Sequence, residues 1–92
     1  MARIKIICHG GAWSIPDDSE EKSMQGVKNA AKAGLDSLLS GSVAEDAVVE
    51  AVVSMENDPA FNAGYGASLT RAGTVELDSM IMRGRDFEIG EL

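Results

Sequence analysis

Two amphipathic runs separated by a single glycine constrain the fold of this chain more than any other feature. The first run extends to about Ser40 and repeats apolar side chains at helical spacing, at Met24, Val27, Ala31, Leu35 and Leu38. Gly41 follows, where a helix-ending glycine is expected. The second run carries Ala47, Val48, Ala51, Val52 and Met55 on one face, and Asn57-Asp58-Pro59 closes it. The pattern therefore predicts two helices joined by a short turn.

Both predicted helices begin with a capping-box signal. Asp18 and Ser42 each precede a glutamate by three residues, which is the spacing of reciprocal side-chain and backbone capping. Gly26 and Gly34 lie inside the first helix, where each weakens it by roughly 1 kcal/mol relative to alanine. We expect close packing against a neighbouring segment to compensate.

Strand-like segments flank this helical block. Residues 4–8 are mainly β-branched and precede His9-Gly10-Gly11, so we predict a buried strand that ends in a Gly-Gly turn. Residues 68–70 and 74–78 flank Arg71-Ala72-Gly73, a loop that suits a hairpin with a G1 bulge. Alternation continues to Met82, a turn follows at 83–86, and 87–89 begin another strand. This order predicts an α+β fold, with two helices on one face of an incomplete sheet and one incomplete domain over residues 1–92.

Size and composition indicate a small folded protein with little stability to spare. The chain has 92 residues, of which 45% are hydrophobic and 25% charged, so disorder is not the expectation. Aromatic residues make up only 4%, which predicts a core of Val, Ile, Leu, Met and Ala. One cysteine cannot form an internal disulfide. We expect the isolated chain to be marginally folded.

Charge narrows the choice of partners. The formal net charge of −7 argues against nucleic acid and anionic membrane, because both require clustered Lys and Arg. No stretch is long and apolar enough to span a bilayer. The free Cys8, together with the lack of an export signal, favours a cytoplasmic location.

Three segments could carry chemistry. The Gly10-Gly11 turn would let backbone N–H groups approach a ligand, although an ordinary strand-ending turn is the alternative. His9 and Cys8 are better explained as structural side chains. The element Asn62-Ala63-Gly64-Tyr65-Gly66 could offer carbonyls to a cation or an amide to a developing negative charge, or could simply connect two elements. Glu76 and Asp78 share a strand face, which is either a carboxylate pair or a solvated surface.

Taken in order, these segments resemble the N-terminal region of the L-asparaginase/isoaspartyl peptidase family. The resemblance covers residues 4 to about 90 and is carried by His9-Gly10-Gly11-Ala12, Asp46-Ala47-Val48, the run from Asp58 to Gly66, and the run from Glu76 to Met82. Taspase and glycosylasparaginase are related proteins that fit less well.

The resemblance implies an N-terminal nucleophile hydrolase with an αββα sandwich, of which this chain would be part. Such a precursor cleaves itself before an internal threonine into α and β subunits, and the mature enzyme is a homodimer of αβ units. The new N-terminal threonine attacks the side-chain amide of asparagine or the isopeptide bond of a β-aspartyl dipeptide, and its amino group is the general base.

Site residues follow from the resemblance alone. Asn62 matches an asparagine close to the nucleophile, and Gly10 and Gly11 match the glycines that border the same site. The loop after the second helix resembles a sodium-binding loop of the family. Its main-chain oxygen ligands would belong to Met55, Glu56, Asp58, Phe61, Ala63 and Tyr65. The resemblance implies no other cofactor.

The sequence also departs from the family pattern. The nucleophile is not expected within these residues, because Gly73-Thr74-Val75 matches the autocleavage triplet but continues as Glu76-Leu77-Asp78. Trp13 and Arg83 replace a glycine and an aspartate of the pattern. We therefore expect an α-subunit fragment that is inactive alone. A non-catalytic truncated product that associates with a full-length relative is the main alternative, and an independent small binding module is another.

Overall fold

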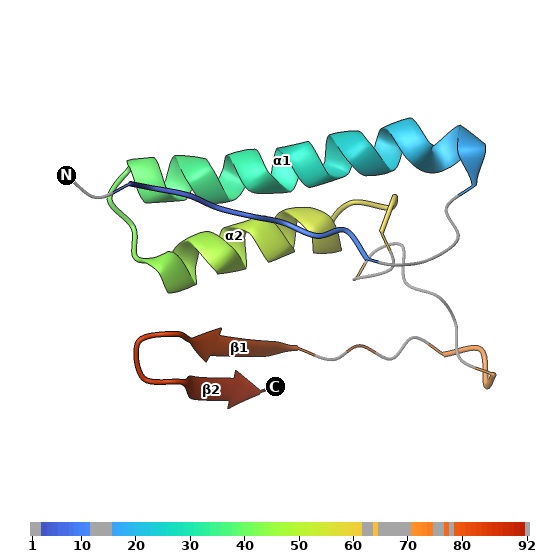
Figure 1. Cartoon of the computed structure of the whole chain (residues 1–92). Helices are drawn as coiled ribbons and strands as arrows, with labels where there is room; N and C mark the ends of the chain where they lie inside the picture. Colours follow the sequence, from blue (N-terminus) through green and yellow to red (C-terminus); the bar gives the residue numbers. More distant parts are fainter. Residues whose placement is uncertain are drawn as a thin grey trace.

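Two helices and a β-hairpin make up the regular structure of the chain. The computed structural model describes residues 3–11, 16–61, 64, 71–74, 77 and 79–91. Within these ranges lie the 3-10 helix η1 (Asp17–Ser19), helices α1 (Glu20–Leu39) and α2 (Ala44–Glu56), and strands β1 (Met80–Arg83) and β2 (Glu88–Glu91). Figure 1 shows α1 and α2 side by side, with the hairpin below them. The predicted α+β composition is confirmed.

The turn between the helices explains where α1 stops and α2 starts. Gly41 has φ +97° and donates its N–H to Leu38 O at 3.1 Å, while Ser42 donates to Ser37 O at 3.1 Å. These two bonds are those of a Schellman motif, so the predicted helix-ending glycine is confirmed. Ser42 is thereby committed to the end of α1. The predicted capping box at Ser42 is wrong, and the N-cap of α2 is the extended Val43, without a side-chain capping bond.

The predicted cap of α1 is also wrong. Ser19 donates its N–H to Pro16 O at 2.9 Å, which starts the 3-10 turn one residue before Asp17. Asp18 therefore lies inside η1, which leads directly into α1, and the N-cap Ser19 makes no side-chain capping bond. Acidic residues in the first turn still favour this end of the helix through its dipole.

The seam between α1 and α2 is lined by small residues. The buried positions are Ser23, Gly26, Ala30 and Gly34 on α1 and Ala47 and Ala51 on α2. A β-carbon built on Gly34 would lie 3.1 Å from Ala47 O and 3.4 Å from the Ala51 Cβ. The predicted close packing at the helix glycines is therefore confirmed. The predicted core of Val, Ile, Leu, Met and Ala is confirmed for alanine alone, because the buried hydrophobic residues of the described ranges are Ala30, Ala47, Ala51 and Phe61.

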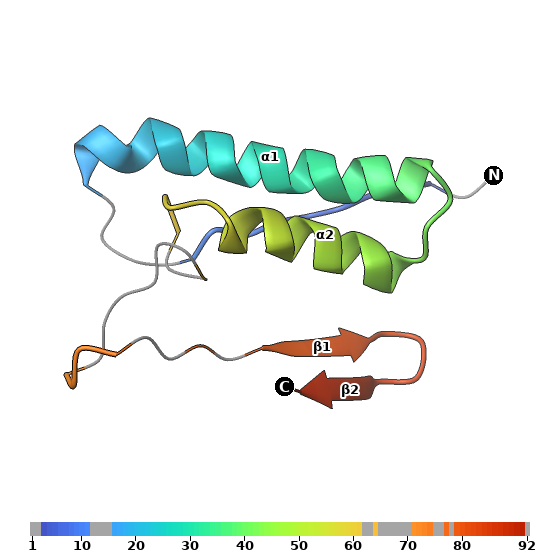
Figure 2. The ribbon, with the colours of Figure 1, turned by 180° about the vertical axis from the view of Figure 1, so that it is seen from behind.

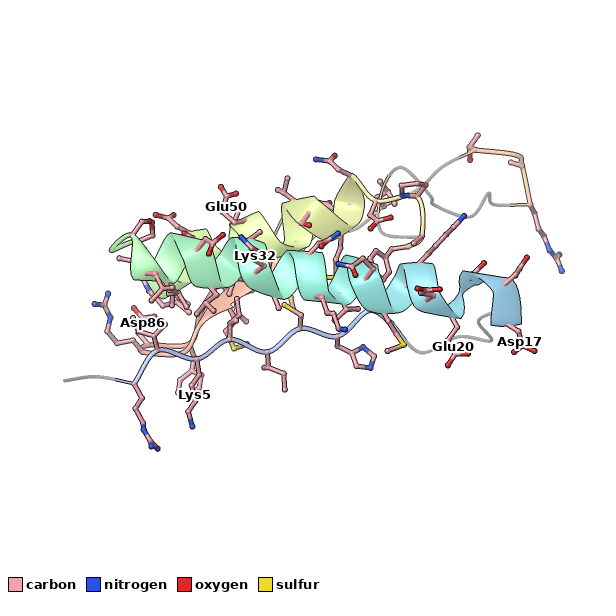
Figure 3. The ribbon with its side chains drawn as sticks, turned by 90° about the horizontal axis from the view of Figure 1, so that it is seen from above. Lys5, Asp17, Glu20, Lys32, Glu50 and Asp86 are labelled. Atoms are coloured by element: carbon pink, nitrogen blue, oxygen red, sulfur yellow. The ribbon has the colours of Figure 1, made fainter. Side chains whose placement is uncertain are left out.

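Residues 3–10 run beside the helices as an extended segment. Its Ile6 side chain lies over Gly34 of α1. Figure 3 shows the segment along one side of α1, with Lys5 pointing away from the helices. The prediction of a buried strand is wrong, because the segment pairs with no strand of the described chain and Ile7 is 95% exposed. Only one face of it is covered, by the helices.

The C-terminal hairpin is antiparallel and pairs Met80 with Glu91 and Arg83 with Glu88. The predicted turn and a second strand after it are confirmed, but Phe87, predicted to begin that strand, lies in the turn with φ +55°. A groove of about 560 Å³ separates this hairpin from α2, lined by Val48, Val49, Val52, Glu56, Ser79, Met80, Ile81 and Gly90. Both helices lie on one side of the hairpin in Figure 2, as predicted. Gly73 has φ +77°, which suits the earlier predicted hairpin, but most of its flanking residues lie outside the described ranges.

Candidate functional site

The extended N-terminal segment ends in a sharp turn at Gly11. This glycine has φ +107°, a backbone angle that residues with a β-carbon rarely adopt. Its N–H donates to His9 Nδ1 at 3.0 Å. His9 is exposed, and by accepting the Gly11 N–H it stabilises the turn that follows it. This local role agrees with the structural interpretation of His9. The Gly11 N–H, once engaged in this way, is not directed at a ligand.

Phe61 brings the loop after α2 to this turn. A β-carbon on Gly10 would lie 2.9 Å from the Phe61 Cε1 and 2.9 Å from the Val27 Cγ2. A β-carbon on Gly26 of α1 would lie 2.6 Å from Cε2 of the same ring. Real β-carbons almost never make such short contacts, so both positions require glycine. The ring is 4% exposed and is held between the two glycines.

The loop 57–61 is ordered by Asp58. Its Oδ1 accepts the Ala60 N–H at 2.9 Å, its carbonyl accepts the Phe61 N–H at 3.1 Å, and its own N–H donates to Met55 O at 3.2 Å. Further along, a β-carbon on Gly64 would lie 2.5 Å from Glu56 O. The chain therefore folds back over the C-terminal end of α2, where the Met55 and Asp58 carbonyls accept the Asp58 and Phe61 N–H groups.

A cavity of about 450 Å³ lies beside the Gly-Gly turn, lined by Gly10, Gly11, Glu20, Ser23, Met24, Val27, Lys28 and Phe61. The structure thus brings together three of the predicted site residues, namely Gly10, Gly11 and Phe61. Asn62, Ala63 and Tyr65 lie outside the described residues. The relation of Asn62 to the site stays a prediction, although Asn62 directly follows Phe61 in the sequence.

Sequence reasoning missed Ser23 and did not identify Phe61 as the contact of Gly26. Ser23 is 7% exposed, and its Oγ makes no hydrogen bond within the described part of the chain. Gly26 forms the seat of the Phe61 ring. Both belong to the series of small α1 residues spaced three or four apart, a pattern that could have indicated the buried face better than the aliphatic residues did.

The remaining sequence candidates are Cys8, Thr74, Glu76 and Asp78. Cys8 is half-buried, and Thr74 is exposed just after the turn at 71–73. Glu76 and Asp78 fall outside the described residues. Within the described ranges, no three His, Cys, Asp or Glu side chains are grouped to hold a metal. Neither described helix is both long and apolar enough to cross a membrane.

Ionic contacts concentrate at the hairpin turn, at the opposite end of the helix pair from residues 57–61 in Figure 1. Arg83 Nε and Nη2 donate to the two carboxylate oxygens of Asp86 at 3.1 and 3.0 Å, and Arg83 also pairs with Glu88. The hydrogen bond from Arg83 lowers the pKa of Asp86, and the carboxylate in turn raises the pKa of Arg83. This cluster stabilises the turn and is separate from the Gly-Gly cavity.

Comparison with known proteins identifies the family. The asparaginase family matches residues 2–92. The chain is 48% identical over 85 residues to an isoaspartyl peptidase/L-asparaginase of Danio rerio, covering 92% of this chain and 27% of that protein. It is 44% identical over 90 residues to the Homo sapiens protein of the same name, covering 98% of this chain and 29% of the relative.

An archaeal relative gives the same result. A plant-type L-asparaginase of Pyrococcus abyssi is 47% identical over 88 residues, covering 95% of this chain and 28% of its own length. The chain therefore spans between 27% and 29% of these relatives. Because the family match runs over almost every residue and includes both the Gly-Gly turn and the Phe61 loop, the chain belongs to the asparaginase family that contains the plant-type L-asparaginases and isoaspartyl peptidases.

Proposed function

We propose that this chain supplies the N-terminal part of a hydrolase that cleaves L-asparagine and β-aspartyl dipeptides. The observation that carries the proposal is the family match over residues 2–92. Relatives named isoaspartyl peptidase/L-asparaginase and plant-type L-asparaginase support the choice of substrates. The juxtaposition of Gly10 and Phe61 supports it further, because both segments that should border the site meet in this chain.

The proposed fold of the complete enzyme is the αββα sandwich of N-terminal nucleophile hydrolases. In it, the hairpin and the extended segment 3–10 would belong to a larger sheet covered by α1 and α2. The segment suits such a place because its helix-facing Ile6 is packed while Ile7 is 95% exposed. The mature assembly would be a homodimer of αβ units.

The proposed chemistry uses a threonine contributed by a segment outside these 92 residues. Its hydroxyl oxygen would attack the side-chain carbonyl carbon of the substrate while its own amino group accepts the proton. The amino group then passes this proton to the leaving nitrogen, which departs as ammonia or as the released amino acid, and water hydrolyses the resulting ester to release aspartate and restore the threonine. Gly10 and Gly11 would border this site, and the Asn62 amide would lie close to the nucleophile.

The end of α2 fits a structural sodium ion in its donor chemistry. The last turn of α2 contains no basic residue, and the helix dipole places partial negative charge at this end, where backbone oxygens are the available donors. Sodium, like calcium, is a hard cation suited to oxygen ligands. The proposed ligands are the main-chain oxygens of Met55, Glu56, Asp58, Phe61, Ala63 and Tyr65. A bound ion would supply loop stability and no chemical step.

One observation favours the second candidate, a non-catalytic chain that associates with a full-length relative. Apolar side chains are exposed on both walls of the groove between α2 and the hairpin, including Val49 at 48% and Met80 at 68%. Uncovered apolar surface of this kind favours association with another polypeptide. Such a partner could cover the groove without creating an active site.

An activity assay separates the two candidates. Ammonia release from L-asparagine and aspartate release from a β-aspartyl dipeptide are measured for the purified chain, and for the chain co-expressed with the C-terminal segment of a family member. No turnover alone and turnover after complementation would support the hydrolase proposal. Co-purification of the two polypeptides without turnover would support the non-catalytic candidate. Turnover by the chain alone would contradict the proposed external nucleophile.

A further inference from the structure

Three segments far apart in the sequence meet at one aromatic ring. The Phe61 ring lies against Gly10 at the end of the extended segment and against Gly26 in α1, and it is 4% exposed. We infer that Phe61 is a positioning residue, which sets the separation between the Gly10-Gly11 turn and helix α1. This role rests on the proposed function, since the turn would border the proposed site.

The two glycines show that the ring sets this separation. Opposite ring edges face the two chains, because Cε1 is nearest to Gly10 and Cε2 is nearest to Gly26, at 2.9 and 2.6 Å from the respective ideal β-carbons. Neither chain can move closer without displacing the ring. A planar aromatic ring has no internal rotations that shorten it, so it is a rigid spacer between turn and helix.

Asp58 fixes the other end of Phe61. Its Oδ2 would lie 2.7 Å from a β-carbon on Gly26, while its Oδ1 and its carbonyl accept the N–H groups of Ala60 and Phe61. Loop 58–61 therefore contacts α1 through the side chains of Asp58 and Phe61, which both lie against Gly26. Any shift of the ring along α1 would carry the backbone of Phe61, and thus the attachment point of residue 62, with it.

The neighbouring cavity shows what would follow from losing the ring. About 450 Å³ of mostly apolar space adjoins Gly10, Gly11 and Phe61 on the side of Met24 and Val27. A flexible side chain at position 61 would leave the turn free to settle toward this space. The expected consequence is a displaced turn with the helix pair still formed, because the seam of Ala30, Ala47 and Ala51 does not involve Phe61.

The first test is structural and requires no activity. The amide resonances of Gly10 and Gly11 are compared by NMR in the full 92-residue chain, in Phe61→Leu, in Phe61→Met and in the control Phe87→Leu, whose aromatic side chain is 73% exposed. We expect both Phe61 variants to shift these two resonances and the control to leave them unchanged. Phe61→Met retains apolar volume without a rigid ring, so it remains informative if Phe61→Leu unfolds.

The second test is kinetic and uses the complemented enzyme of the preceding subsection. Misplacement by about 1 Å can cost up to about 100-fold in rate. We therefore expect Phe61→Leu to lower kcat at least about tenfold with little change in KM, and Phe87→Leu to leave both unchanged. A merely structural role would reduce the amount of folded enzyme and not the kcat of the folded fraction.

The outcomes of the two tests are distinguishable. Unchanged Gly10 and Gly11 resonances in both Phe61 variants would overturn the inference, whether or not the enzyme is active. If the Phe61 variants shift the two resonances but the complemented wild-type enzyme shows no turnover, the spacer role stands and the proposed function is contradicted. Shifted resonances with unchanged kcat would overturn the positioning role in catalysis. If both Phe61 variants unfold, Asp58→Ala, which removes the side-chain contacts that hold loop 58–61 on α1, should shift the same two resonances, and their constancy would overturn the inference.

Discussion

The helix pair and the hairpin are stabilised in different ways. The seam of α1 and α2 buries glycine, alanine and one serine, so its stability depends on how closely two backbones approach. The hairpin buries almost nothing, with Met80 at 68% and Ile89 at 54% exposure, and depends on its backbone ladder and on the Arg83 cluster. The helix pair should therefore respond to changes of volume, and the hairpin to changes of charge.

The two phenylalanines of the chain provide the largest expected contrast. Phe61→Ala removes a ring that is 4% exposed and should lower the free energy of unfolding by about 3–5 kcal/mol, which is the typical cost of such a cavity. Phe87→Ala, at a position 73% exposed, should change it by no more than about 0.5 kcal/mol. Urea unfolding followed by circular dichroism measures both. Equal effects would mean that the two regions do not differ as described.

The two turns give the next contrast. Gly41 has φ +97° with open space around it, so Gly41→Ala should cost about 1–2 kcal/mol of stability through backbone strain alone. Gly84 in the hairpin turn also has open space and no positive φ, so Gly84→Ala should be neutral or stabilise by up to about 1 kcal/mol. Thermal unfolding of both variants checks the prediction. A stabilising Gly41→Ala would show that the Schellman motif is not formed in solution.

Acid should weaken the hairpin through Asp86, which is the smallest of the three effects. Hydrogen bonds from Arg83 and from the Glu88 N–H lower the pKa of Asp86 in the folded state. A lowered folded pKa means that the stabilisation is present above the ordinary carboxyl pKa of about 3.9 and is lost as the pH falls through the folded value. The Glu88 amide resonance should follow this titration, while amides of the α1–α2 seam should not.

Arg83→Gln is the matched control for that titration. It removes the guanidinium that donates to Asp86 at two atoms, so the Asp86 pKa should rise toward its ordinary value. A titration of Asp86 that is the same in the variant and in the original chain would refute the assignment of the shift to Arg83.

The sequence allowed the element types to be predicted better than their packing. Helical periodicity and Gly41 predicted both helices and the turn, because these depend on local residue order. The capping boxes failed because Ser42 is used by the end of α1 and Asp18 by η1, a competition that spacing alone does not reveal. The aliphatic residues suggested the wrong buried face, because close contact between helices selects small side chains at the seam.

The candidate site was predicted in part. Gly10 and Gly11 were singled out as a turn near a ligand, and the structure places Gly10 against Phe61. The role of Gly26 could not be predicted in detail, because contact between residues 26 and 61 depends on how the loop returns to α1. Asn62 and the proposed sodium ligands came from family resemblance, which gives residue positions and not geometry.

The close contacts of the helix pair also fix the order in which the chain can become structured during synthesis. Gly34, Ala47 and Ala51 belong to the seam, Ile6 packs on Gly34, and Phe61 completes the contacts with Gly10 and Gly26. All of them precede the hairpin in the sequence. A ribosome adds roughly 5–20 residues per second, and N-terminal parts fold first. The helix pair can therefore assemble seconds before the hairpin and serve as the surface on which later segments settle.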